Sequence, residues 1–203
     1  MDAEQIDDGA ALRDEPVEVE VTSSDLVYQG RVWDVRSDTV RYGGDEIVRQ
    51  YVDHPGAAAI VALDDEGRVL LIQQYRHPLR MRDWEIPAGL LDVHGEDPID
   101  AARRELAEEA DLDTGSIERL VSVFTTPGGN DEIVHVFLAR DLSPSRKKHD
   151  REAEEADIRI AWVPLEDAVA AVMDGRMRNG ILTIGLLATA ERLRGGGASA
   201  AHG

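Results

Sequence analysis

The feature that most constrains the fold is an amphipathic helix, which the sequence predicts from Asp97 to Ala110. Asp97 can cap the first turn, Pro98 suits the first helical position and Asp100 falls in the first turn. One side of the helix is apolar and is formed by Ile99, Ala102, Leu106 and Ala110. Because these residues recur at steps of three and four, they form a stripe that must pack against other elements.

Strand patterns flank this helix on both sides in the sequence. Residues 17–56 alternate or are β-branched, with a turn at Gly43-Gly44, and predict an antiparallel β meander. Two apolar runs around Asp65-Glu66-Gly67 predict a hairpin over 57–76 whose strands are buried on both faces. Further strands are predicted at 120–126, 132–140 and 158–163, and further helices at 165–175 and 181–194.

Intermixed strands and helices predict an α/β (α+β) fold, in which a mixed β-sheet is sandwiched between helices. We expect residues 1–16 to be a disordered acidic segment and 17–56 to be the meander. Residues 57–194 should form the main domain, followed by a disordered tail of small residues at 195–203.

The charge of the chain excludes some partners. With 41 acidic and 22 basic side chains the formal net charge is −19, which argues against binding to nucleic acid or to an anionic membrane. The sequence has no cysteine, so disulfides and thiolate metal sites are excluded, and a cytoplasmic location is expected. The longest apolar stretch is far too short to span a bilayer.

The predicted helix carries three carboxylates on the flank beside its apolar stripe. They belong to Glu105, Glu108 and Glu109, with neither His nor Cys nearby, and an all-oxygen site of this kind suits Mg²⁺, with Mn²⁺ as a substitute. The alternative is a solvated acidic face on which Arg104 pairs with Glu108 four residues later.

The residues around this helix resemble the Nudix box. In the stretch GLLDVHGEDPIDAARRELAEEADL the motif positions are occupied by Gly89, Glu96, Arg104, Glu105, Leu106, Glu108, Glu109 and Leu112. Two features depart from the usual pattern: the loop between Gly89 and Glu96 is one residue longer, and Asp111 replaces a glycine. Asp can adopt the left-handed conformation that glycine provides at a helix end, and neither change removes a ligand.

The resemblance implies a Nudix-type fold and metal-dependent hydrolysis of a nucleoside diphosphate linked to another group. By position, Glu105 and Glu109 would be the principal metal ligands, with Glu108 as a further or outer ligand. The backbone carbonyl of Ala88 would add a ligand, and Arg104 would orient a glutamate. Glu96 would be structural. Metals that bridge diphosphate oxygens neutralise their charge, while a carboxylate takes the proton of the attacking water.

From Tyr28 to Leu187 the chain is similar to the ADP-ribose pyrophosphatase branch of this family. The resemblance implies that Arg76 contacts phosphate or the terminal ribose and that Glu85 helps to bind substrate. Pro127-Gly128 stands where ADP-ribose-acting members tend to carry a proline, and would shape the ribose side. The alternatives are a surface ion pair for Arg76 and Glu85 and an ordinary turn for Pro127-Gly128.

In that branch a glutamate after the box activates the water. The matching segment here is REAEEADIRIAW, in which Glu155 is favoured, Glu154 is the second candidate and Glu152 remains open. The alternative is that this segment is a solvated charged loop.

The N-terminal meander resembles the part through which related enzymes form a homodimer. On this resemblance Arg49 would contact the nucleotide, and Trp33 or Tyr28 would pack near it or serve only in packing. The expected activity is hydrolysis of ADP-ribose to AMP and ribose 5-phosphate.

The alternatives are a pyrophosphatase for another nucleoside diphosphate sugar, such as GDP-mannose or ADP-glucose, and a non-catalytic ADP-ribose sensor. The sensor is the less favoured alternative, because a regulator of that kind usually carries a basic DNA-binding domain and this chain is strongly acidic. An enzyme that removes oxidised nucleoside triphosphates ranks below both pyrophosphatases, because it would be shorter.

Overall fold

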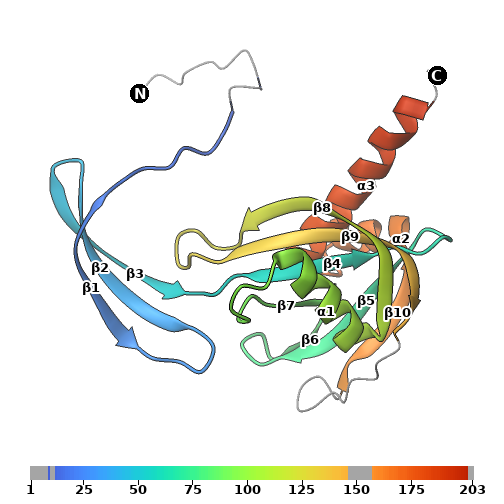
Figure 1. Ribbon diagram of the computed structural model, residues 1–203, viewed down its shortest axis with the longest axis horizontal. Helices are drawn as coiled ribbons and strands as arrows, with labels where there is room; N and C mark the ends of the chain where they lie inside the picture. Colours follow the sequence, from blue (N-terminus) through green and yellow to red (C-terminus); the bar gives the residue numbers. More distant parts are fainter. Residues whose placement is uncertain (1–8, 10–11, 146–156, 201–203) are drawn as a thin grey trace. The chain divides into compact units, whose positions relative to one another are not determined.

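The structure is a computed structural model that describes residues 9, 12–145 and 157–200, with 196–200 as backbone alone. The chain divides into two compact units, Met1–Tyr51 and Val52–Gly203. In chain order the elements are β1 (Glu20–Tyr28), β2 (Asp34–Tyr42), β3 (Asp45–Asp53), β4 (Ala57–Ala62), β5 (Arg68–Arg76), β6 (Met81–Glu85), β7 (Ala88–Leu90), α1 (Pro98–Ala110), β8 (Leu112–Phe124), β9 (Ile133–Pro144), β10 (Arg159–Pro164), α2 (Leu165–Met173) and α3 (Gly180–Ala200), labelled in Figure 1.

The predicted meander is confirmed, and it lies in the first unit except for the end of β3, where Val52 and Asp53 belong to the second. Strands β1, β2 and β3 are neighbours in that order, and β1 pairs antiparallel with β2. Gly43 and Gly44 have φ angles of 62° and 93°, which glycine adopts without the steric cost of a side chain. The two glycines therefore permit the tight turn from β2 into β3.

The second unit contains a mixed sheet, in the order β7-β4-β9-β8, and a smaller sheet in the order β10-β5-β6. Strand β4 is parallel to β9 and antiparallel to β7, and β8 is antiparallel to β9. The predicted fold class, a mixed sheet with helices on its faces, is confirmed in this unit.

The predicted hairpin over 57–76 is wrong in its pairing, although both strands exist. Its turn forms as expected, since the Gly67 amide donates to the carbonyl oxygen of Asp64 at 3.1 Å. Beyond one bridge between Leu63 and Val69, however, β4 and β5 enter different sheets. Both edges of β4 are already paired, with β7 and β9, so no edge of β4 is left for β5.

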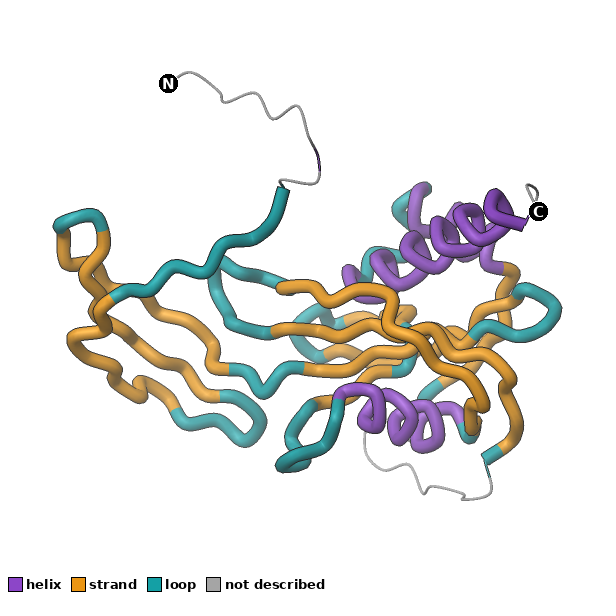
Figure 2. The backbone as a smooth tube through the Cα atoms, turned by 45° about the horizontal axis from the view of Figure 1, so that its top comes forward, coloured by secondary structure: helices purple, strands orange, loops and turns teal. Residues whose placement is uncertain are grey.

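Strand β4 is buried along its whole length, and its two faces contact different helices. Ala58, Ile60 and Ala62 pack with Leu106 and its neighbours on α1. Ala57, Ala59, Val61 and Leu63 pack with residues of α2 and α3. Figure 2 shows α1 on one side of this sheet and α2 and α3 on the other. The sheet is thus the middle layer of three, which fixes α1 to a rigid support.

Both ends of α1 are specified by its own sequence. The side chain of Asp97 accepts from the Ile99 amide at 3.0 Å, and Pro98 opens the helix as predicted. At the other end Asp111 has φ 55° and ψ 34°, the left-handed conformation, and its amide donates back to carbonyls of the last turn.

Two other boundaries differ from the predictions. Strand β8 begins at Leu112, well before residue 120, because pairing with β9 extends over the turn-like residues that follow the helix. Helix α3 continues to Ala200, whereas the sequence predicted a disordered tail from 195. Within the ranges described above, no helix is both long and apolar enough to cross a membrane.

Candidate active site

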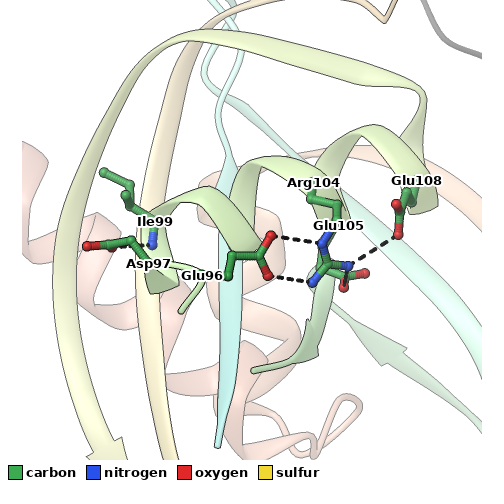
Figure 3. A network of polar contacts seen from close by, with 6 residues as sticks. All are labelled: Glu96, Asp97, Ile99, Arg104, Glu105 and Glu108. Atoms are coloured by element: carbon green, nitrogen blue, oxygen red, sulfur yellow. Dashed lines mark hydrogen bonds and ion pairs between the residues drawn. The ribbon is translucent and has the colours of Figure 1, made fainter. Parts of the chain in front are cut away.

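Arg104 on α1 is the centre of a network of carboxylates (Figure 3). Its Nε and Nη2 donate to the two oxygens of Glu96 at 3.1 and 3.0 Å. Its Nη1 donates to Glu105 Oε1, and also to Glu108 Oε2 at 3.4 Å. One guanidinium therefore holds three carboxylates, and its bidentate pair with Glu96 joins the helix to the loop that precedes it.

Arg104 and the carboxylates of this network stabilise each other's charged forms. The hydrogen bonds from Arg104 hold the pKa of Glu96 below its ordinary value. In turn, the hydrogen bond to Glu96 and the nearby charge of Glu105 raise the pKa of Arg104 above its ordinary value, although partial burial opposes this. Arg104 therefore stays cationic at any pH at which the protein is folded.

Glu105 lies directly against β7. A β-carbon built on Gly89 would lie 1.9 Å from Glu105 Oε1 and 2.1 Å from its carboxyl carbon. Any side chain at position 89 would thus displace this carboxylate, whose own side chain is only 12% exposed. The glycine of the motif is required by the close approach of Glu105 to the strand.

Glu109 makes a second link between α1 and β7. Its Oε2 accepts from the Ala88 amide at 2.9 Å, and the residue is 6% exposed. A buried carboxylate is costly unless it is hydrogen-bonded or close to a cation, so its position beside β7 needs such partners. The backbone of Ala88 and Gly89 therefore meets Glu105 and Glu109 at one place.

The donor set of this place fits a hard divalent cation. It consists of carboxylate oxygens from Glu105, Glu108 and Glu109 and backbone carbonyl groups of β7, which are the ligands that Mg²⁺ and Mn²⁺ prefer. Within the described residues, no group of three His, Asp or Glu side chains is already arranged around one point. Instead Glu105 and Glu108 point to Arg104, and Glu109 to Ala88, so each of the three carboxylates has a hydrogen-bond donor from the protein.

Arg76 and Glu85 form the ion pair that was the alternative to substrate binding. Nε and Nη2 of Arg76 donate to the two oxygens of Glu85 at 2.7 and 2.6 Å, and Gln74 adds a contact to Glu85 at 3.3 Å. The Glu85 side chain is 7% exposed and that of Arg76 is 43% exposed. Glu85 is therefore a buried anchor, whereas Arg76 has a surface that a ligand can reach.

Pro127 and Gly128 lie in the turn between β8 and β9. The turn is closed by the Gly129 amide, which donates to the carbonyl oxygen of Thr126 at 2.8 Å. Within the second unit it is attached to Val52, because the Val52 amide donates to the Gly129 carbonyl at 3.0 Å. A β-carbon at Gly128 would meet no atom within 4 Å, so this turn presents an open surface.

The remaining predicted residues lie elsewhere. Arg49 is on β3 in the first unit, where its Nη1 donates to the carbonyl oxygen of Val48 at 2.9 Å. In the same unit Tyr28 and Trp33 are 64% and 47% exposed. Glu152, Glu154 and Glu155 lie outside the described residues.

The structure adds polar contacts that the sequence did not single out. Arg82 donates to the backbone and side-chain oxygens of Asp157, the residue at which the described chain resumes. On the other flank, the Ser145 amide donates to the Asp111 carbonyl at 2.8 Å, beside the end of α1. Gln74 could have been found, since it interrupts the apolar run of β5, but nothing in the local pattern marks Arg82.

Comparison with known proteins agrees with this geometry. The family model described as NUDIX domain matches residues 53–182. An ADP-ribose pyrophosphatase of Mycobacterium tuberculosis is 42% identical over 173 residues, which covers 83% of this chain and 82% of the relative. An ADP-ribose pyrophosphatase of Bacillus subtilis is 37% identical over 157 residues, covering 77% and 84%.

A solved structure supports the fold independently. The crystal structure of an ADP compounds hydrolase superposes with a TM-score of 0.76 and covers 91% of this chain and 99% of that chain. At 21% identity this likeness shows the fold alone. The matched family model, the extent of the relatives and the carboxylate helix on its three-layer support lead to one conclusion: this chain belongs to the Nudix family.

Proposed function

We propose that this chain is a metal-dependent pyrophosphatase that hydrolyses ADP-ribose to AMP and ribose 5-phosphate. The observation that carries the proposal is the meeting of Glu105 and Glu109 with the Ala88–Gly89 backbone at the centre of the motif. Two relatives that share most of their length with this chain bear the name ADP-ribose pyrophosphatase.

In this proposal Glu105 and Glu109 hold Mg²⁺, or Mn²⁺ in its place, together with Glu108 and the carbonyl oxygen of Ala88. Such a cation neutralises diphosphate oxygens and lowers the pKa of a bound water. Arg104 offsets part of the negative charge of these carboxylates and orients Glu105 and Glu108 through its hydrogen bonds.

The substrate is held by groups around this cluster. The exposed part of Arg76 binds a phosphate or the terminal ribose, and Glu85 fixes the guanidinium plane through two hydrogen bonds. Pro127 and Gly128 form the ribose side through their open turn. Glu155, or its neighbour Glu154, accepts the proton of the attacking water.

A homodimer is part of the proposal. Every residue of β1 is exposed, and the first unit exposes many large apolar side chains. These residues are Val19, Val21, Leu26, Val27, Tyr28, Val32, Trp33, Tyr42 and Val48. Because so much exposed apolar surface usually marks an interface, we assign it to a second copy of the chain, which would bring Arg49 to the nucleotide. We also propose a cytoplasmic location.

The test is product release from ADP-ribose, ADP-glucose, GDP-mannose and NADH, each at equal concentration with Mg²⁺. The proposal expects the highest kcat/KM with ADP-ribose and equal amounts of AMP and ribose 5-phosphate. A higher kcat/KM with another nucleotide sugar would support the pyrophosphatase activity but contradict ADP-ribose as the preferred substrate. Binding of ADP-ribose without hydrolysis in either Mg²⁺ or Mn²⁺ would favour a sensor.

A further inference from the structure

His54 occupies a position between two parts of the second unit that face the proposed substrate. It lies in the short connection from β3 to β4, and its side chain is 9% exposed. A buried imidazole must find partners for both ring nitrogens, so its contacts are informative.

One nitrogen faces the turn that contains Pro127 and Gly128. Nε2 of His54 lies 3.6 Å from Glu132 Oε1, and Glu132 Oε2 accepts from the Thr125 hydroxyl at 2.6 Å. The backbone of His54 adds a link, because its amide donates to Asp131 Oδ1 at 2.9 Å. The turn is flanked on one side by Thr125 and on the other by Asp131 and Glu132. These contacts therefore hold its two ends together.

The other nitrogen faces the strand pair at the carboxylate cluster. The Gly56 amide donates to Nδ1 at 3.1 Å, which requires Nδ1 to be unprotonated and places the proton of the neutral ring on Nε2, toward Glu132. The carbonyl oxygen of Gly56 accepts from the Leu91 amide at 3.1 Å. The next residues of β4 pair with Leu90, Gly89 and Ala88 of β7.

The backbone at Gly56 has little freedom to move. Its φ is +84°, and a β-carbon there would lie 3.1 Å from the carbonyl oxygen of Ile133 at the start of β9. Displacement of Gly56 would therefore press on β9 or pull on β7. The imidazole contacts this point through Nδ1.

We propose that His54 is a positioning residue that couples the Pro127–Gly128 turn to the β7 backbone at the metal cluster. It rests on the proposed function, in which the turn receives the sugar and β7 contributes to the diphosphate site. In this role His54 acts through Gly56 and Glu132 and not by direct contact with substrate or metal. It fixes the spacing between the two subsites, and so determines the affinity for a substrate that spans both.

Two isosteric variants separate its two contacts. In His54→Asn the side-chain oxygen can replace Nδ1 as acceptor for Gly56, but the contact with Glu132 is lost. In His54→Gln the side-chain amide can replace Nε2 beside Glu132, but the bond from Gly56 is lost. Each variant removes one of the two side-chain contacts on which the proposed coupling depends and leaves the backbone bond from His54 to Asp131 in place, so each should raise KM for ADP-ribose about tenfold while kcat changes less than about threefold.

Glu132→Gln removes the charge on the turn side and should raise KM in the same way. The double variant His54→Asn with Glu132→Gln should have a KM no higher than that of either single variant, because both substitutions remove the same contact between positions 54 and 132. Glu66→Gln is the matched control, since its side chain is 68% exposed in the turn after β4 and its KM should be unchanged. The proposal would be overturned if the increases in KM of the two single variants multiplied in the double variant, or if KM were unchanged in His54→Asn.

Amide hydrogen exchange gives a readout that needs no activity. His54→Asn should speed exchange at Gly129, whose amide closes the turn, and leave Leu91 protected, whereas His54→Gln should do the reverse. If exchange follows this pattern but wild type does not hydrolyse ADP-ribose, the proposed function fails and the coupling stands. Equal exchange in both variants and wild type would overturn the coupling itself.

Discussion

Gly89 leaves the space that the carboxylate of Glu105 fills, since a β-carbon at position 89 would lie 1.9 Å from Glu105 Oε1. The atoms in conflict are the far end of a flexible side chain, which can move away. Gly89→Ala should therefore leave the fold intact and misplace a proposed metal ligand. We expect kcat to fall about a hundredfold, because an error near 1 Å in a catalytic group costs this much.

The measurement for Gly89→Ala is kcat together with the melting temperature. Gly180→Ala is the matched control, because a β-carbon there meets no atom within 4 Å. Wild-type kcat in Gly89→Ala would contradict the assignment of Glu105.

Glu96→Gln tests the bidentate pair with Arg104. The folded-state pKa of Glu96 is lowered by hydrogen bonds from Arg104, so the pair stabilises the protein fully above the unfolded-state pKa, about 4.3. This stability is lost as the pH falls from there through the lowered folded-state pKa. The variant should thus melt below wild type at neutral pH, and the difference should shrink under acid conditions.

Thermal melts of wild type and Glu96→Gln across this pH range check the sign. A difference in melting temperature that grows as the pH falls would refute the pairing. Glu66→Gln serves as the exposed control and should follow wild type at each pH.

Arg76→Lys tests the anchored guanidinium. A lysine cannot donate two parallel hydrogen bonds, so the buried Glu85 would lose one of its two short bonds from position 76 and keep the longer contact from Gln74. We expect about 1–3 kcal/mol lower free energy of unfolding and a KM for ADP-ribose about tenfold higher. Urea denaturation and initial rates measure the two quantities.

Arg194→Lys is the control for this change, because its pair with Glu191 is exposed on both sides and should be worth less than about 1 kcal/mol. Equal effects of the two lysine substitutions on unfolding would show that Glu85 is no anchor.

Leu26→Glu tests the proposed homodimer. Leu26 is 49% exposed on β1, and a charge there should disrupt an interface formed by the first unit. Light scattering should then give the mass of a dimer for wild type and of a monomer for the variant. Met173→Glu places the same charge on another exposed apolar residue, at the end of α2, and should leave the mass unchanged. A monomeric wild type would contradict the proposed homodimer.

Local signals were sufficient to predict α1 and the meander. Asp97 and Pro98 specify the helix start by hydrogen bonding and fixed backbone geometry, which depend on no distant residue. Asp111 took the left-handed conformation because its short polar side chain tolerates it. Gly43 and Gly44 specified the turn between β2 and β3 in the same way.

Pairing between distant strands could not be predicted in this way. The turn at Gly67 was correct, yet β4 pairs with β9, whose residues follow much later in the chain, and no local pattern identifies that partner. Likewise, Gly115 and its polar neighbours resemble a turn, but the long ladder with β9 holds them in β8. Tertiary pairing overrides local preference in both cases.

The candidate site was predictable in its residue types and less so in its contacts. Helical spacing placed Glu105, Glu108 and Glu109 together and allowed, as the alternative, a pair of Arg104 with Glu108. The structure has that contact at 3.4 Å, but it gives the bidentate contact to Glu96. The proposed role of His54 depends on contacts with Gly56 and Glu132 that only the folded chain reveals.

The most direct test of the account is the Mg²⁺ dependence of ADP-ribose hydrolysis in wild type and Glu109→Gln. Glutamine keeps an oxygen that can accept from the Ala88 amide, so the fold should persist while one charge of the proposed metal site is removed. Glu118→Gln, half exposed on β8, is the control. We predict Mg²⁺-dependent activity in wild type and the control and a loss of about a hundredfold or more in Glu109→Gln. Equal rates in Glu109→Gln and wild type, or full wild-type activity in the presence of a chelator, would contradict it.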